Sequence, residues 1–184
     1  MYLKRKLDIL LSCLLLLITL PLIILCFLIS FLELKELPIF RHKRIGQYGK
    51  EINIYKIKTI SSHQPILYGK KAQASKCCAI IRKYSLDELL QLINVLKNEM
   101  SLIGPRPVTK HEWDNFIFAT EYEKGLVLSY KPGITGLWQV SGRNELSYQQ
   151  RLKMDVKYCR RYLFKNDLLI IIKTVCAVFK ATGC

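Results

Sequence analysis

The chain has 184 residues, which is enough for one domain with an attached anchor. Lys and Arg outnumber Asp and Glu by 29 to 14, and this excess favours anionic lipid, polyphosphate or nucleic acid as a partner. The seven cysteines are odd in number and have no metal-ligand spacing, so the sequence argues against a zinc site and a disulfide framework, and for reduced thiols.

The N-terminal segment is an apolar block with no charged residue from Ile9 to Leu32. It is longer than the roughly 7–15 apolar residues of a signal peptide, and no small-residue cleavage site follows it, which disfavours a cleaved signal. It also exceeds the roughly 20 residues that cross a bilayer as a helix. A spanning helix and a re-entrant hairpin therefore both fit its length.

Two features favour the hairpin over the span. Pro21 lies in the middle of the block, where it removes one helix hydrogen bond, and Thr19 could satisfy a carbonyl that the proline frees. Basic residues flank both ends, whereas one end of a span is expected to be poor in Lys and Arg; they are Lys4, Arg5 and Lys6 before the block and Lys35, Arg41, Lys43 and Arg44 after it. We therefore predict a membrane-inserted helix hairpin over residues 1–36.

Residues 37–184 are predicted to form a compact cytosolic domain that is mainly α with a small β component, an α+β fold. The alternating segment 52–57 indicates a strand. Further segments indicate a loop at 61–75, a short helix or connector at 77–84, a helix at 85–98, a weakly helical segment at 111–124 and a tight loop at 131–136. Residues 147–162 and 166–180 have amphipathic patterns that fit the interfacial helices we predict and ordinary core helices equally well.

Two adjacent carboxylates, Asp87 and Glu88, stand at the predicted start of the helix over 85–98. Ser85 and Glu88 have the spacing of a capping box, in which the hydroxyl caps a backbone N–H and the glutamate reaches back. Asp87 then lies in the first turn, where free N–H groups and the helix dipole favour an ionised carboxylate and an anion site. Acidic residues in a first turn more often serve the dipole alone, so this pattern leaves both interpretations open.

Beyond this helix, Arg106 stands between Pro105 and Pro107. The two prolines restrict the backbone of the arginine before any ligand binds, which lowers the entropy cost of holding a phosphate with its guanidinium group. A lone arginine is usually a solvated surface residue, but the restricted backbone favours a binding role at this position.

Segments that contain these residues resemble the bacterial sugar transferase family, the monotopic phosphoglycosyl transferases that start lipid-linked glycan assembly. They are Arg82 to Leu96, Met100 to Pro107 and Lys131 to Asn144, and other pieces agree: Lys4-Arg5 with Asp8, Pro38 to Phe40, Arg44 to Gly46, Tyr55-Lys56, and Asp155 with Tyr158 and Asp167. The resemblance covers nearly the whole chain, and its joint pattern is specific. The sequence departs from the family pattern at Lys58, Ile60 and Leu90.

The resemblance implies an enzyme that moves a sugar-1-phosphate from a UDP-sugar to polyprenyl (undecaprenyl) phosphate and releases UMP. It places the reaction at the cytosolic face of the bacterial inner membrane, as the first membrane step of capsule, exopolysaccharide, O-antigen or glycoprotein glycan assembly. Asp87 would be the nucleophile that forms an aspartyl-phosphate, and Glu88 would assist it. The two carboxylates would hold Mg²⁺, while Arg82, Arg106 and Arg143 would bind phosphate.

The expected partners are the UDP-sugar, polyprenyl phosphate, membrane lipid, downstream glycosyltransferases and, as an option, a second copy in a homodimer. Nucleic acid is not expected, because the chain contains no recognisable nucleic-acid-reading module. The alternative function is a non-catalytic membrane-surface adaptor with basic lipid-binding faces. An adaptor leaves the paired carboxylates and the three arginines unexplained.

Overall fold

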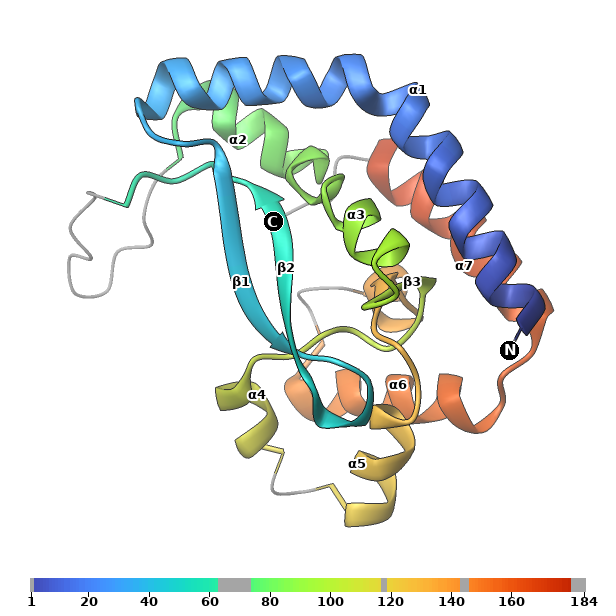
Figure 1. Ribbon diagram of the computed structural model, residues 1–184. Helices are drawn as coiled ribbons and strands as arrows, with labels where there is room; N and C mark the ends of the chain where they lie inside the picture. The colour runs from blue at the N-terminus through green and yellow to red at the C-terminus, as the bar shows by residue number, and fades with distance from the viewer. Residues whose placement is uncertain (1, 63–73, 117–118, 143–145, 180–184) are drawn as a thin grey trace.

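The computed structural model describes residues 2–62, 74–116, 119–142 and 146–179 (Figure 1). Helices dominate these residues, and two small sheets accompany them, so the predicted α+β class is confirmed. The helices and strands are α1 Tyr2–Leu34, β1 Ile39–Ile45, β2 Glu51–Ile57, α2 Lys76–Lys83, α3 Gln91–Leu96, β3 Ser101–Ile103, α4 Lys110–Asp114, α5 Glu121–Leu128, β4 Gly133–Thr135, α6 Tyr148–Arg160 and α7 Phe164–Phe179. Single 3₁₀ turns are η1 Gln47–Gly49, η2 Leu86–Glu88 and η3 Trp138–Val140.

The apolar block forms one helix, α1, and the predicted reversal of the chain within residues 1–36 is wrong. Pro21 lies inside α1, and Figure 1 shows the helix bending near its middle. A proline removes a single hydrogen bond, here the one to the Leu17 carbonyl, so it bends a long helix without ending it. The Thr19 hydroxyl donates to the Leu15 carbonyl at 2.7 Å, not to the carbonyl that the proline frees. By length and composition α1 could cross a membrane.

Both ends of α1 are attached to the rest of the molecule. Near its start, Lys4 Nζ donates to Asp167 Oδ2 at 2.7 Å and to the Ile103 carbonyl at 2.9 Å, and Asp8 accepts from Ser101 Oγ at 2.8 Å. Near its end, Ser30 Oγ donates to the Lys58 carbonyl. Between these contacts, one side of the helix carries buried residues while large apolar side chains on the other side stay exposed.

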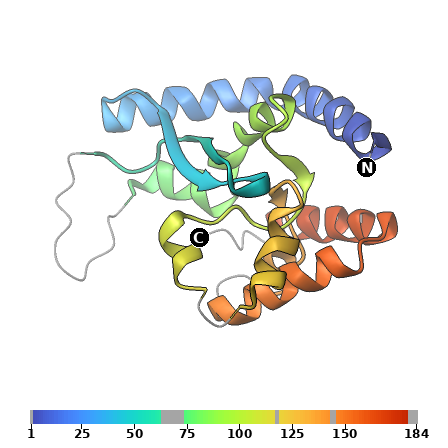
Figure 2. The same cartoon turned by 60° about the horizontal axis from the view of Figure 1, so that its bottom comes forward.

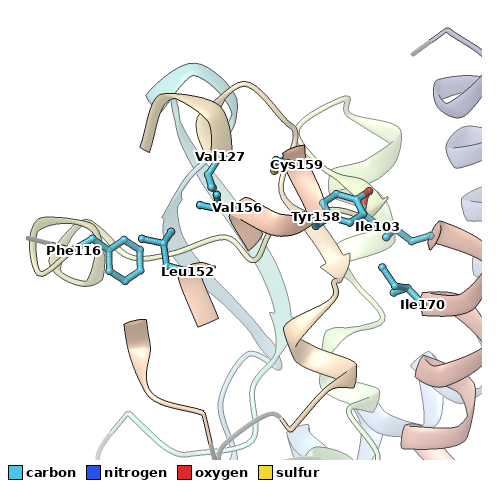
Figure 3. Close-up of a cluster of buried hydrophobic side chains, with 8 residues drawn as sticks. All are labelled: Ile103, Phe116, Val127, Leu152, Val156, Tyr158, Cys159 and Ile170. Carbon is cyan, nitrogen blue, oxygen red and sulfur yellow. The ribbon is translucent and has the colours of Figure 1, made fainter. Parts of the chain in front are cut away.

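The main hydrophobic core lies among β3, α5, α6 and α7 (Figure 3). Its buried members are Ile103, Phe116, Val127, Leu152, Val156, Tyr158, Cys159 and Ile170. Because α6 contributes four of these residues, it is a core helix, and the expectation that it lies in a membrane interface is wrong. Helix α7 buries Asp167 and Ile170 but exposes apolar side chains along its length: Leu168, Leu169, Ile172, Val175 and Phe179.

Several shorter predictions are confirmed or refined. The strand at 52–57 is β2, which pairs antiparallel with β1 in a hairpin. Residues 77–84 are mostly helix α2, and the weakly helical segment 111–124 divides into α4 and α5. Most of the predicted loop at 61–75 lies outside the described residues.

A close backbone approach joins two segments that are distant in sequence. Strands β3 and β4 pair in parallel, with Ser101 opposite Gly133 and Ile103 opposite Thr135. A Cβ atom on Gly133 would lie 2.1 Å from the Gly104 nitrogen, so glycine is required there by space and not by backbone angle. The contact places the Gly104-Pro105-Arg106 segment beside the loop that leads to Trp138.

Candidate active site

The carboxylates lie in a 3₁₀ turn, η2, and not in the capped helix that the sequence predicts. Ser85 has a left-handed backbone (φ 56°, ψ 26°) and its side chain makes no cap hydrogen bond. Helix α3 begins later, at Gln91. The capping box is absent, and Glu88 instead turns toward a cation: Lys56 Nζ donates to Glu88 Oε1 at 2.6 Å, a hydrogen bond between two charged groups.

Glu88 is held in its ionised form. Burial by itself would raise the pKa of this carboxyl, but the charges of Lys56 and Arg106 outweigh it and lower the pKa below its usual range. Lys56 was not singled out as a site residue from the sequence. The available signal was its position in β2, where it continues the alternation of the buried residues Ile52 and Ile54.

Asp87 behaves in the opposite way to its neighbour. Burial, followed by repulsion from Glu88, raises the pKa of Asp87 to about 6, and the charges of Lys56 and Arg82 oppose this only in part. The two adjacent carboxyls therefore have pKa values driven apart, a pattern typical of sites where two acids have different roles. Asp87 is a weakly solvated carboxylate at neutral pH, which suits a nucleophile.

Arg106 is positioned from both its backbone and its side chain. Its backbone N–H donates to Asp155 Oδ2 at 3.3 Å. The neighbouring residues Pro105 and Pro107 are both buried. Its guanidinium lies 5.3 Å from the centre of the Trp138 ring, and its charge acts on Glu88. Burial raises the pKa of Asp155 well above the usual range.

Of the other two arginines predicted to bind phosphate, the structure describes Arg82 but not Arg143. Arg82, in the last turn of α2, is close enough to act on the charge of Asp87. Arg143 lies outside the described residues. The structure thus associates Arg82 with Asp87 and Arg106 with Glu88, and Lys56 acts on both carboxylates.

A cavity of about 540 Å³ extends from Glu88 between α1 and α7. Its polar end contains Ser85, Glu88, Arg106, Trp138, Gln139 and Arg151. Its walls are mostly apolar and include Leu11, Leu14 and Leu15 of α1, Leu89 and Leu92, Ile134, and Ile171, Val175 and Val178 of α7. Figures 1 and 2 show the N-terminal half of α1 and helix α7 on the same side of the molecule, facing each other. The shape and lining suit a ligand with one anionic end and a long apolar part.

The donor set fits magnesium that is bound together with a substrate. Mg²⁺ is usually held by one or two carboxylates plus substrate phosphates, and Asp87 and Glu88 offer two adjacent carboxylates. Within the described parts of the chain, no group of three or more His, Cys, Asp and Glu side chains could hold an ion alone. Asp87 and Glu88 would thus supply two of the ligands that such an ion needs.

Comparison of the sequence with known proteins shows which family the chain matches. A family model described as bacterial sugar transferase matches residues 1–181. The chain is 36% identical to the undecaprenyl-phosphate galactose phosphotransferase of Salmonella typhimurium, over 99% of the chain and 41% of that relative. It is 33% identical to the exopolysaccharide production protein ExoY of Sinorhizobium fredii, over 98% of the chain and 87% of ExoY.

The name of a third relative states a sugar donor and a lipid acceptor. The chain is 35% identical to the UDP-glucose:undecaprenyl-phosphate glucose-1-phosphate transferase of Caulobacter vibrioides, over 94% of the chain and 68% of that protein. The chain therefore spans about two fifths of the length of the Salmonella relative and most of the length of the other two.

Proposed function

Because this chain belongs to the bacterial sugar transferase family, we propose that it transfers a sugar-1-phosphate from a UDP-sugar to undecaprenyl phosphate and releases UMP. The observation that carries the proposal is the cavity, whose polar end holds Glu88 and Arg106 and whose walls are apolar. A polyprenyl phosphate has the same division into an anionic head and an apolar chain. The product would begin an exopolysaccharide, capsule or related surface glycan, to which downstream glycosyltransferases add further sugars.

The reaction has two displacement steps at one phosphorus. An Asp87 carboxylate oxygen attacks the phosphorus that carries the sugar, the bond from that phosphorus to the bridging oxygen breaks, and UMP leaves with that oxygen. An oxygen of the polyprenyl phosphate then attacks the same phosphorus, and the Asp87 carboxylate leaves as a free anion. The weak solvation behind the raised pKa of Asp87 supports the first step.

The other residues of the site stabilise negative charge. Arg106 is oriented by Trp138 and Asp155, and a guanidinium can bind a phosphate through two parallel hydrogen bonds. Lys56 keeps Glu88 ionised and turned into the site. Mg²⁺ held by Asp87 and Glu88 would neutralise diphosphate charge when bound.

We further propose that α1 enters one leaflet from the cytosolic side of the inner membrane and stays there, so that the protein is monotopic. Lys4 at one end and Ser30 near the other both bond to the same catalytic domain. A straight span would carry these two ends to opposite sides of the bilayer. The exposed apolar faces of α1 and α7 would then meet lipid.

One assay separates the proposed enzyme from a non-catalytic adaptor. Purified protein in detergent or nanodiscs is given a panel of UDP-sugars with Mg²⁺, with and without undecaprenyl phosphate, and UMP release is measured. The proposal expects steady UMP release with the lipid and with at least one UDP-sugar. An adaptor would release none under any combination.

The topology has its own test. Single cysteines are placed at Tyr2 and at Leu37, which are 78% and 80% exposed, in a background that lacks the native cysteines. A membrane-impermeant thiol reagent added outside intact cells should label neither position. Labelling of one position from outside would show that α1 crosses the membrane.

A further inference from the structure

Two arginines share one indole at the polar end of the cavity. The guanidinium of Arg106 lies 5.3 Å from the centre of the Trp138 ring, and that of Arg151 lies 4.8 Å from the same centre. Trp138 is 5% exposed, so it is a fixed support for both groups. Arg151 did not emerge as a site residue from the sequence, because nothing in the local pattern shows that the first turn of α6 meets η3.

Arg151 is held in a way that leaves its outer nitrogens available. Its Nε donates to the Leu146 carbonyl at 2.9 Å, and its guanidinium also lies over the Tyr148 ring at 5.2 Å. The hydrogen bond of Nε and the contacts with the Trp138 and Tyr148 rings together hold the plane of the guanidinium group in place. The two terminal NH₂ groups carry the remaining donors, in the fork geometry that matches a phosphate.

The guanidinium groups of Arg106 and Arg151 have no close ion-pair partner in the described residues, although the charge of Arg106 acts at longer range on Glu88 and Asp155. No salt bridge within 4 Å is formed by Arg106 or Arg151 there. Glu88 is engaged by Lys56 at 2.6 Å, and Asp155 receives the backbone N–H of Arg106. Two like charges on one ring repel each other, and an anion bound to both would relieve that repulsion.

The position of the pair indicates what the anion is attached to. Arg106 and Arg151 line the same cavity as the leucines of α1 and the aliphatic residues of α7. A nucleotide has no group that would fill such walls, whereas an isoprenoid chain would. We propose that Arg151 is a binding residue for the lipid substrate, and that Arg106 and Arg151 on Trp138 hold the phosphate of the polyprenyl phosphate. This inference rests on the proposed function.

The two half-reactions allow a direct test. Without lipid, enzyme and UDP-sugar should release UMP only in a burst of about one per enzyme molecule; with lipid, turnover continues. Arg151→Gln should leave the burst unchanged and raise the apparent KM for undecaprenyl phosphate at least about tenfold, as expected when a hydrogen bond between charged groups is lost. Arg151→Lys, which keeps the charge without the fork, should recover part of the loss.

The matched control is Arg160→Gln on the same helix. Arg160 also lies over an aromatic ring, that of Tyr122 at 5.7 Å, but does not line the cavity. It should leave both the burst and the KM for the lipid unchanged. Thermal unfolding is recorded for each variant, and Arg151→Lys serves as the test variant if Arg151→Gln fails to fold.

A competition experiment identifies the source of the phosphate. Dodecyl phosphate should compete with undecaprenyl phosphate in wild type far better than inorganic phosphate, and Arg151→Gln should weaken the competition by dodecyl phosphate. Equal competition by inorganic phosphate would overturn the lipid assignment, as would an unchanged KM or an equal loss of the burst in Arg151→Gln. Absence of any UMP release by wild type would instead refute the proposed function itself.

Discussion

At the polar end of the cavity each side chain has its own role, whereas the side chains of the apolar walls share one role. At the polar end, the charges of Lys56 and Arg106 lower the pKa of Glu88. Beside Glu88 in sequence but outside the cavity lining, burial raises the pKa of Asp87. The walls are built from many interchangeable aliphatic side chains of α1 and α7, several of them half exposed. The proposed chemistry would therefore depend on a few individual side chains, whereas the proposed binding of an isoprenoid chain would be shared among many weak contacts.

The largest expected effect comes from removing Asp87, the proposed nucleophile. Asp87→Asn should lower UMP release by at least about a thousandfold, as loss of a covalent nucleophile does in other enzymes. Because ionised Asp87 is unfavourable in the fold, as its raised pKa indicates, the variant should unfold at the same temperature as wild type or higher at pH 7. Asp114→Asn, at an exposed ion pair in α4, is the control. Turnover near the wild-type level would refute the assignment of Asp87.

The next effect concerns the support of the polar end. Gly133→Ala places a methyl group against the Gly104 backbone at 2.1 Å and should lower the free energy of unfolding by about 3 kcal/mol, with loss of activity. Gly125→Ala in α5 meets no atom within 4 Å and should instead stabilise the protein by about 0.5–1 kcal/mol. Chemical denaturation measures both. Equal stability of the two variants would show that the β3–β4 contact is looser than described.

A smaller effect is the pH dependence that the two carboxyls produce. Asp87 must be ionised to attack, so kcat/KM for the UDP-sugar should fall about tenfold per pH unit below pH 6, given its pKa of about 6. Glu88→Gln removes the neighbouring negative charge, which lowers the pKa of Asp87 and should move this decline to lower pH. The shift should be partial, because burial is the larger cause. A decline that begins only near pH 4 in wild type would contradict the perturbed pKa.

The smallest effect tests the walls. Leu14 is 51% exposed and lines the cavity, so Leu14→Ala should change the free energy of unfolding by less than about 1 kcal/mol. The apparent KM for undecaprenyl phosphate should rise about three- to tenfold through lost apolar contact, with an unchanged UMP burst. Leu37→Ala, at an 80% exposed position outside the cavity lining, should change neither. A loss as large as that expected for Asp87→Asn would mean that the walls are as specific as the polar end.

The sequence predicted best where a long periodic pattern decides the structure. The extents of α6 and α7 and the position of β2 follow from apolar runs and spacing. The apolar block of α1 was also visible, but its path as one helix was not predicted. The turn at Asp87 was predicted less well, because the lysine that redirects Glu88 is 32 positions away. A capping box is a local rule, and here a distant charge overrides it.

The same limit applies to the pairing of β3 with β4 and to Arg151. Glycines in both paired segments, Gly104 and Gly133, were visible in the sequence, but only the fold shows that each excludes a side chain from the other. The contact of Arg151 with Trp138 likewise requires α6 to pack on the core. The candidate site residues could therefore be selected in advance, whereas their contacts could not.

Helix α1 has a consequence for how the protein can be handled. It contributes one wall of the cavity through Leu11, Leu14 and Leu15 and is joined to the domain at both ends. A shortened protein that starts after residue 36, made to improve solubility, would keep the carboxylates and arginines but lose the wall of the cavity that α1 forms. Exchanging α1 for an unrelated apolar helix would have the same result, so α1 is a part of the cavity that cannot be replaced as a module.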